Sequence, residues 1–260
     1  MIVYILVHYT MFWSPLEQFS IFPIVSIALT DLFDFSITNS VVFVSIAISL
    51  LFMLLLMISS KMTYIPTIWQ VLLESLYSFV FFSILSENIK KGGVIYFPIM
   101  ISIFVFILIS NLIGMIPFSF TATSHIIVTL SLASMIFIGI NIIGIRTHGL
   151  HMLSLFLPAG APLALAPLLV FIEMGSYAFR VVSLSLRLFA NMMSGHCLLK
   201  ILAGFGWTMF SSANILTIAH IMPVAVVFVI MGLELGIAFL QAYVFTLLLC
   251  VYLNDAINLH

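Results

Sequence analysis

Long uncharged apolar runs alternate with short polar segments along most of the chain. One run covers residues 39–60, and two more cover residues 96–116 and 125–145. A helix needs about 20 such residues to cross ~30 Å of hydrocarbon, and each run reaches that length. These runs therefore predict three membrane-spanning helices.

Two much longer apolar stretches follow, at residues 162–203 and 213–254. Pro162 and Pro167 are candidate helix starts for the first, and Pro223 is a candidate kink in the second. At 1.5 Å per residue, each helix would be roughly 60 Å long, about twice the hydrocarbon thickness. We expect them to form a long hairpin that is strongly tilted or bent within the membrane.

Residues 67–89 show a different pattern, because Gln70, Glu74 and Ser78 recur every four residues within an apolar segment. Such a polar stripe is typical of an amphipathic helix in the membrane interface. The segment is flanked by three lysines, Lys61, Lys90 and Lys91. If the helix lies flat in the interface, all three lysines are on one face of the membrane, as the positive-inside rule favours. If the helix spans the membrane, Lys61 and the Lys90–Lys91 pair are on opposite faces. We therefore predict an interfacial helix.

Residues 1–38 mix short apolar runs with prolines and acids, so we expect an interfacial or extramembrane leader. Residues 39–260 then form a single membrane domain. The predicted fold class is all-α integral membrane protein, with five membrane helices plus one amphipathic interfacial helix.

Composition supports this class. Of the 260 residues, 64% are hydrophobic and only 6% are charged, whereas soluble domains carry about 25% charged residues. The net charge of −1 gives no basic surface, so the lipid bilayer is an expected partner and nucleic acid is not. The two cysteines, Cys197 and Cys250, lie in apolar segments and are expected to be buried free thiols.

Against this apolar background, Arg187 requires an explanation. Arginine does not lose its proton at accessible pH, and placing it near the bilayer centre costs ~3 kcal/mol on insertion scales. Glu173 and Arg180 precede it at intervals of seven residues, and Asn191 follows four residues later. Seven residues are nearly two helical turns, so these side chains share one stripe.

The last helix carries a second stripe, formed by Glu234, Gln241 and Asp255 at intervals of seven and fourteen residues. Two antiparallel helices thus each present a line of polar groups, which indicates aqueous pathways or a charged partner. His196 lies nine residues after Arg187, about half a turn away in angle, so it faces a different neighbour on a straight helix.

Structural interpretations remain open for several of these groups. Arg180 can snorkel or pair with Glu173, His196 can be a hydrogen-bonded core histidine, and Gln241 can be a helix-packing amide. His148 and His151 have a spacing compatible with a metal, but no cysteine or carboxylate lies close by.

The sequence contains no nucleophile–base pair, glycine-rich phosphate loop or metal signature, and no cofactor site is predicted. We therefore expect no catalysis by this chain alone. Passage of protons or other ions is the favoured class of function.

Residues 186–196, LRLFANMMSGH, resemble the most recognisable motif of subunit a of F-type ATP synthases. The stretch NLIGMIPFSFTATSH (111–125) is similar to another family motif, and LQAYVFTLLLCVYL (240–253) resembles the closing helix of the family. SPLEQF near the start resembles mitochondrial versions. The resemblance covers most of residues 60–255.

The resemblance implies roles for individual residues. Arg187 matches the essential arginine of the family, Asn191 the asparagine after it, and Gln241 the glutamine opposite it. His196 and Glu234 match a pair that is swapped in many bacterial versions, and this arrangement is typical of mitochondria and alphaproteobacteria. Glu173 matches an acidic position beyond the arginine, and Arg180 a basic position beside it.

The implied function is that of the proton-translocating stator of the membrane motor, with two offset half-channels separated by the arginine. The implied partners are a rotor ring of small proteolipid subunits, the peripheral stalk and other membrane subunits. The implied location is the mitochondrial inner membrane, with a bacterial inner membrane as the alternative.

Two other classes of function make different predictions. A secondary ion transporter or channel with an intramembrane Arg/Glu site predicts internal repeats, which the sequence lacks. A structural subunit of a respiratory complex predicts isolated polar residues, whereas here they align in two stripes.

Overall fold

The computed structural model describes residues 14–26, 28–30, 33–34, 36–59, 66–89, 93–116, 119–149, 152, 166–211 and 219–258. Five residues used in the sequence argument lie outside these ranges: Lys61, Lys90, Lys91, His151 and Pro162.

Helices account for nearly all of the described chain, as the apolar runs predict. The long elements are α2 (Asn39–Ser59), α3 (Ile68–Ser78) with the π-helix η2 (Phe79–Ser86), α4 (Phe97–Gly114), α5 (Ile126–His148), α6 (Ala166–Ser211) and α8 (Ile221–Ile257). Three short 3-10 helices are η1 (Pro15–Phe19), η3 (Gly93–Tyr96) and η4 (Ala122–Ser124). Within the described residues, six helices are long and apolar enough to cross a membrane. The predicted class, an all-α membrane protein, is confirmed.

The predicted ends of the two long helices need correction. α6 continues to Ser211, beyond the expected end at residue 203, and α8 covers Ile221–Ile257, whereas the expected start at residue 213 lies outside the described residues. Pro223 therefore lies in the first turn of α8, where its missing N–H removes no helical hydrogen bond. It belongs to the helix start, and the predicted kink at this position was wrong.

Length and composition place the segment Ile68–Ser86 among the helices able to span a membrane. Its polar stripe is present, with Gln70 Nε2 donating to Glu74 Oε1 at 2.9 Å on the exposed surface. The interfacial placement of this helix stays a prediction.

Four short strands precede α2, where no strand was predicted. β1 (Pro23–Val25) pairs with β4 (Ile37–Thr38), and β2 (Ala28–Thr30) pairs with β3 (Phe33–Asp34), both antiparallel. Buried Asn39 fixes this segment to the start of α2. Its side chain donates to the Ser20 carbonyl at 3.0 Å and accepts from the Phe22 N–H at 3.4 Å.

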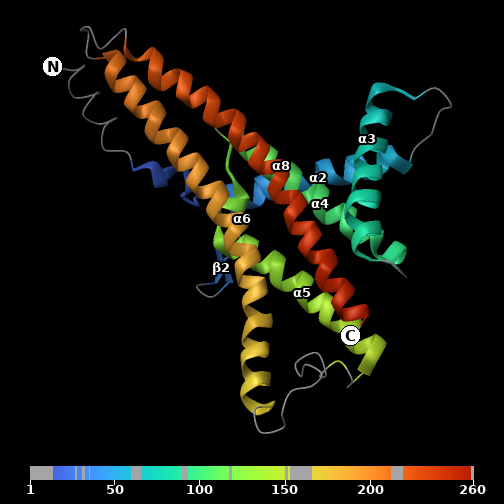
Figure 1. The fold of residues 1–260 in the computed structure, drawn as a ribbon. Coiled ribbons are helices and arrows are strands. Elements are labelled where there is room, and N and C mark those ends of the chain that lie inside the picture. Colours follow the sequence, from blue (N-terminus) through green and yellow to red (C-terminus); the bar gives the residue numbers. More distant parts are fainter. Residues whose placement is uncertain are drawn as a thin grey trace.

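The two long helices, α6 and α8, organise the fold (Figure 1). The C-terminal part of α6 and the N-terminal part of α8 lie side by side, and the two helices diverge toward their other ends. α5 packs against both helices. α6 is visibly bent, which agrees with the expectation from its length. α4 packs against α8, and α2 and η2 pack against α4.

Aromatic packing holds α8 against α4 and η2. The Phe79 ring lies 6.0 Å from that of Phe104 and 5.8 Å from that of Phe239, centroid to centroid. Phe104 and Phe245 are fully buried. This packing fixes the rotation of α8 about its axis and so determines which of its polar residues face α6.

The two cysteines are free thiols, as predicted. Cys250 is buried, whereas Cys197 is only half-buried because α6 lies at the edge of the helix assembly.

Candidate functional site

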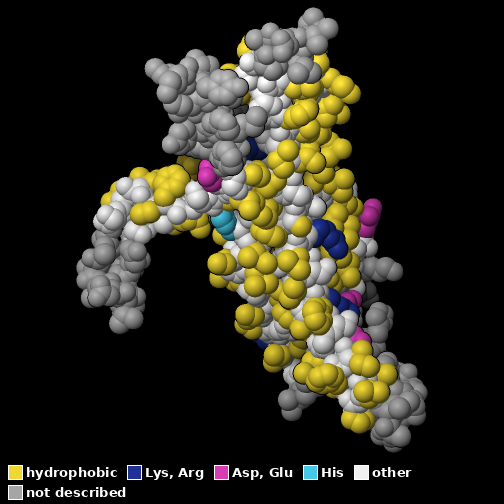
Figure 2. All heavy atoms as spheres, turned by 90° about the vertical axis from the view of Figure 1, so that its left-hand side faces the viewer, with side chains coloured by type: hydrophobic (Ala, Val, Ile, Leu, Met, Phe, Trp, Pro, Cys, Tyr) yellow, Lys and Arg dark blue, Asp and Glu magenta, His cyan; other side chains and the backbone are white. Residues whose placement is uncertain are grey.

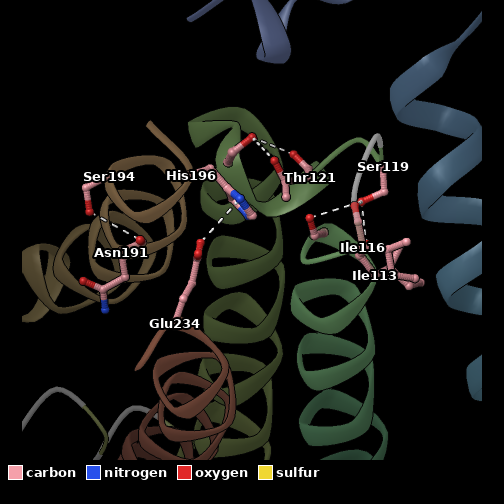
Figure 3. Close-up of polar contacts among 10 residues, drawn as sticks. Ile113, Ile116, Ser119, Thr121, Asn191, Ser194, His196 and Glu234 are labelled. Carbon is pink, nitrogen blue, oxygen red and sulfur yellow. Dashed lines mark hydrogen bonds and ion pairs between the residues drawn. The ribbon is translucent and has the colours of Figure 1, made fainter. Parts of the chain in front are cut away.

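His196 of α6 and Glu234 of α8 face each other between the two long helices (Figure 3). His196 Nδ1 lies 3.4 Å from Glu234 Oε1. Glu234 is only 2% exposed, so a carboxyl group is enclosed by helices in an apolar surrounding. We call these two residues the His–Glu pair.

Gly195 makes room for this arrangement. A Cβ atom at this position would lie 2.7 Å from Glu234 Oε1 and 3.0 Å from its carboxyl carbon. These distances are shorter than van der Waals contact, so any larger residue displaces the carboxyl group. The glycine in the ANMMSGH motif is therefore explained by the close approach of Glu234.

Several buried polar atoms around the start of α5 and the His–Glu pair have no hydrogen-bond partner among the described residues. They are His196 Nε2, both carboxylate oxygens of Glu234, Thr123 Oγ1 and His125 Nε2. The segment η4, which contains Thr123, packs against α6, and Figure 3 shows the adjoining Thr121 near His196. Buried polar groups are costly unless they hydrogen-bond. Their concentration here is suited to proton exchange rather than to simple packing.

A layer of side-chain amides lies beyond the His–Glu pair. Asn191 Nδ2 donates to Gln241 Oε1 at 2.9 Å, joining α6 to α8, and Gln241 is 4% exposed. On the α4 side, fully buried Asn111 donates to the Ala238 carbonyl at 3.4 Å. Sequence analysis did not select Asn111 as a site residue, although a single asparagine in the apolar run of α4 was a usable signal.

Arg187 is on the exposed face of α6, unlike its neighbours in the stripe. Among the described residues, it takes part in no ion pair. The rise of an α-helix places it roughly 13 Å along the axis from His196 and roughly 10 Å from Arg180. The face shown in Figure 2 is largely hydrophobic and carries few basic side chains, one of which lies beside acidic side chains.

A second polar cluster, the Arg180 cluster, lies on the other side of Arg187. Arg180 lies between two carboxylates, 3.7 Å from Glu173 Oε1 on its own helix and 3.9 Å from Asp255 Oδ2 on α8. All three side chains are partly exposed, at 33% to 43%. The spacing placed these residues on two separate stripes, and the structure brings them together.

Two tyrosines and an asparagine complete the Arg180 cluster. The guanidinium carbon of Arg180 lies 5.7 Å from the ring centre of Tyr177 and 5.6 Å from that of Tyr252. Tyr177 Oη donates to Asn141 Oδ1 of α5 at 2.7 Å. Sequence analysis missed all three. Tyr177 and Tyr252 each lie three residues before a predicted site residue, which places them beside it on the helix.

His148, which sequence analysis considered as a metal ligand, joins two helix ends instead. Its Nε2 atom lies 2.7 Å from the Ile257 carbonyl oxygen, so the ends of α5 and α8 are held together. The described residues contain no group of three His, Cys, Asp or Glu side chains that could hold a metal ion.

Comparison with known proteins gives a consistent result. The family model described as ATP synthase A chain matches residues 40–254. ATP synthase subunit a of Marchantia polymorpha is 51% identical over 95% of this chain and 99% of its own length. The subunits a of Chondrus crispus and Brassica napus are 51% and 50% identical, each over 95% of this chain and 97% of its own length. The chain therefore belongs to the ATP synthase subunit a family.

Proposed function

We propose that this chain is the membrane subunit of an ATP synthase that conducts protons to and from a rotor ring. One observation carries the proposal. Arg187, permanently charged, lies on the outer face of a membrane helix without an ion-pair partner among the described residues, and polar clusters lie on either side of it. A charge held in this way requires a partner outside the chain.

The His–Glu pair is suited to proton entry. Both residues can hold or release a proton, they are 3.4 Å apart, and they lie between two helices rather than on the lipid-facing surface. A proton arriving from the outer side can pass from this pair to a rotor carboxylate. Neutralised in this way, that carboxylate can move into lipid, where its charged form would be strongly disfavoured.

The Arg180 cluster is suited to proton release on the opposite side. Glu173 and Asp255 are partly exposed carboxylates, and the Arg180 guanidinium lies 3.7 Å from the first and 3.9 Å from the second. Either can accept a proton from a rotor carboxylate that has completed nearly a full turn. The partial exposure of the cluster gives that proton a route to water.

Arg187 separates the two clusters and prevents direct leakage between them. A fixed positive charge repels a proton that would travel along α6 from one cluster to the other. It also favours the ionised form of the rotor carboxylate passing it. The asparagine–glutamine bond between Asn191 and Gln241, one turn from Arg187, keeps α6 and α8 in register at this barrier.

The partners we propose are a ring of small proteolipid subunits, the peripheral stalk and other membrane subunits. The subunits a of the relatives above are named for the same complex. We propose the mitochondrial inner membrane as the location, on the His–Glu arrangement and the resemblance of SPLEQF to mitochondrial versions.

Replacing Arg187 tests the proposal. In membrane vesicles containing the assembled complex, Arg187→Ala should abolish ATP-driven proton pumping, measured with a pH-sensitive dye. Arg146→Ala, at the exposed end of α5, is the matched control and should pump normally. Normal coupled pumping by Arg187→Ala, at an unchanged amount of assembled complex, would refute the proposed function.

A further inference from the structure

We propose that Tyr177, held by Asn141 of α5, is a positioning residue that keeps Arg180 shared between Glu173 and Asp255. The inference rests on the proposed function, because it assigns Tyr177 a role within the release pathway. It concerns a pair, Tyr177 and Asn141, that the polar stripes of α6 and α8 do not include.

The tyrosine hydroxyl is held firmly. Tyr177 Oη donates to Asn141 Oδ1 at 2.7 Å, the usual distance for a well-formed O–H···O bond. The amide of Asn141 is itself oriented, because its Nδ2 donates to the Phe137 carbonyl at 3.0 Å. That bond directs the oxygen of the amide toward Tyr177. The Phe137 ring packs against the tyrosine ring at 4.7 Å, so the position of Tyr177 is set from α5.

The guanidinium of Arg180 does not form a close, hydrogen-bonded ion pair with either carboxylate. Its nitrogens lie 3.7 Å from Glu173 and 3.9 Å from Asp255, both longer than a hydrogen bond. By contrast, the two tyrosine rings lie at cation–π distance, 5.7 Å and 5.6 Å away. The rings, one from α6 and one from α8, therefore hold the cation midway between the acids.

This placement matters because an arginine free to move forms a closer pair with one carboxylate. Arg180 would then settle on Glu173, the nearer group and a member of its own helix. Asp255 would then lose its contact with the cation, and the two carboxylates of the cluster would no longer share it. Besides the two acids, the titratable groups that contact Arg180 are Tyr177 and Tyr252, and His148 of α5 contacts the Ile257 carbonyl two residues beyond Asp255.

The test uses two variants on different helices. Tyr177→Phe keeps the ring but removes the hydroxyl, and Asn141→Leu removes the acceptor. ATP synthesis is measured in vesicles per assembled complex, with the pH on the entry side fixed and the pH on the release side varied. Both variants should change the shape of the release-side profile relative to wild type, because the cation is no longer shared between the two carboxylates. The rate at neutral pH should fall about two- to tenfold, the range expected for one hydrogen bond.

The combined variant should lose no more than either single variant, because both remove the same bond. Ser134→Ala is the matched control, since it removes from α5 a hydroxyl that donates to the Ser131 carbonyl of its own helix. It should leave the pH profile in place.

An unchanged profile in both Tyr177→Phe and Asn141→Leu overturns the inference, as does an equal change in Ser134→Ala. Arg187→Ala in the same vesicles separates this failure from that of the proposed function. If Arg187→Ala abolishes coupled proton pumping while Tyr177→Phe behaves as wild type, the proposed function stands and only the role of Tyr177 is disproved.

Discussion

His196 and Glu234 approach to 3.4 Å across the boundary between α6 and α8, although 38 residues separate them in the sequence (234 − 196). The contact depends on the register of two helices rather than on either helix alone. One residue of slippage rotates a helical side chain by about 100°, which would turn the carboxyl group away from the imidazole. The pair is therefore sensitive to anything that shifts the hairpin.

Removing the charge of Glu234 should slow proton entry. Glu234→Gln keeps the size of the side chain but cannot release a proton, so proton-driven ATP synthesis should fall at least about tenfold, as for loss of a positioned acid–base group. Glu87→Gln, on the exposed surface near the end of η2, is the control and should have no effect. Unchanged proton flux in Glu234→Gln, measured by a pH-sensitive dye, would reduce Glu234 to a structural group.

Adding a methyl group at position 195 should displace the carboxyl group of Glu234. The new Cβ would lie 2.7 Å from Oε1, so Gly195→Ala should reduce proton flux by roughly tenfold or more. Gly204→Ala, in the same helix with open space around it, is the matched control. Because alanine favours helix over glycine by about 1 kcal/mol, the control should keep full activity and thermal stability. Equal activity in the two variants would show that the site tolerates the shift.

The Asn191–Gln241 bond should act as one unit. Asn191→Ala and Gln241→Ala each remove one partner of a 2.9 Å bond, so the double variant should be little worse than either single variant. For comparison, the Ser194 hydroxyl donates to the Asn191 carbonyl of its own helix at 3.3 Å. Ser194→Ala combined with Gln241→Ala should show simple additivity. The measurement is the rate of ATP-driven pumping, and additive losses for Asn191 and Gln241 would argue against coupling.

The interfacial placement of α3 and η2 can be tested by chemical labelling. We expect Ile68→Cys and Glu87→Cys, both exposed, to react with a membrane-impermeant thiol reagent from the same side of the vesicle. The background has Cys197 and Cys250 replaced by alanine, since both are free thiols. A spanning helix would instead place the two sites on opposite sides, and only one of them would be labelled.

The membrane helices could be predicted because their cause is local. An apolar run of sufficient length satisfies its backbone only as a helix in lipid, and α2, α4 and α5 follow their runs within three residues at each end. The end of α6 and the start of α8 could not be read this way, because no proline or Asp, Glu, Lys or Arg residue separates the two apolar stretches between residues 203 and 221. The β-strands before α2 were missed for another reason. Their pairing depends on contacts such as Asn39 with Ser20 and Phe22, which no periodicity records.

In the candidate site, too, the features set within one helix could be predicted, whereas the contacts between helices could not. Helical spacing placed Glu173, Arg180 and Arg187 on one stripe, but it could not show that Arg180 meets Asp255 of another helix. That contact depends on the rotation of α8 about its own axis. The rotation is fixed by the Phe79 ring of η2, which packs against Phe239 of α8 and Phe104 of α4. Asn141 was missed because its role appears only once α5 is packed beside Tyr177.

The outward position of Arg187 also has a consequence for biogenesis. A newly inserted chain without its neighbours exposes a permanent charge to acyl chains, at a cost of ~3 kcal/mol or more. A chain without its partners is therefore marked as incomplete by Arg187, the residue to which the proposed function assigns the central role. Membrane quality control that senses polar groups in lipid can distinguish the two states, so survival of the chain becomes dependent on prompt assembly.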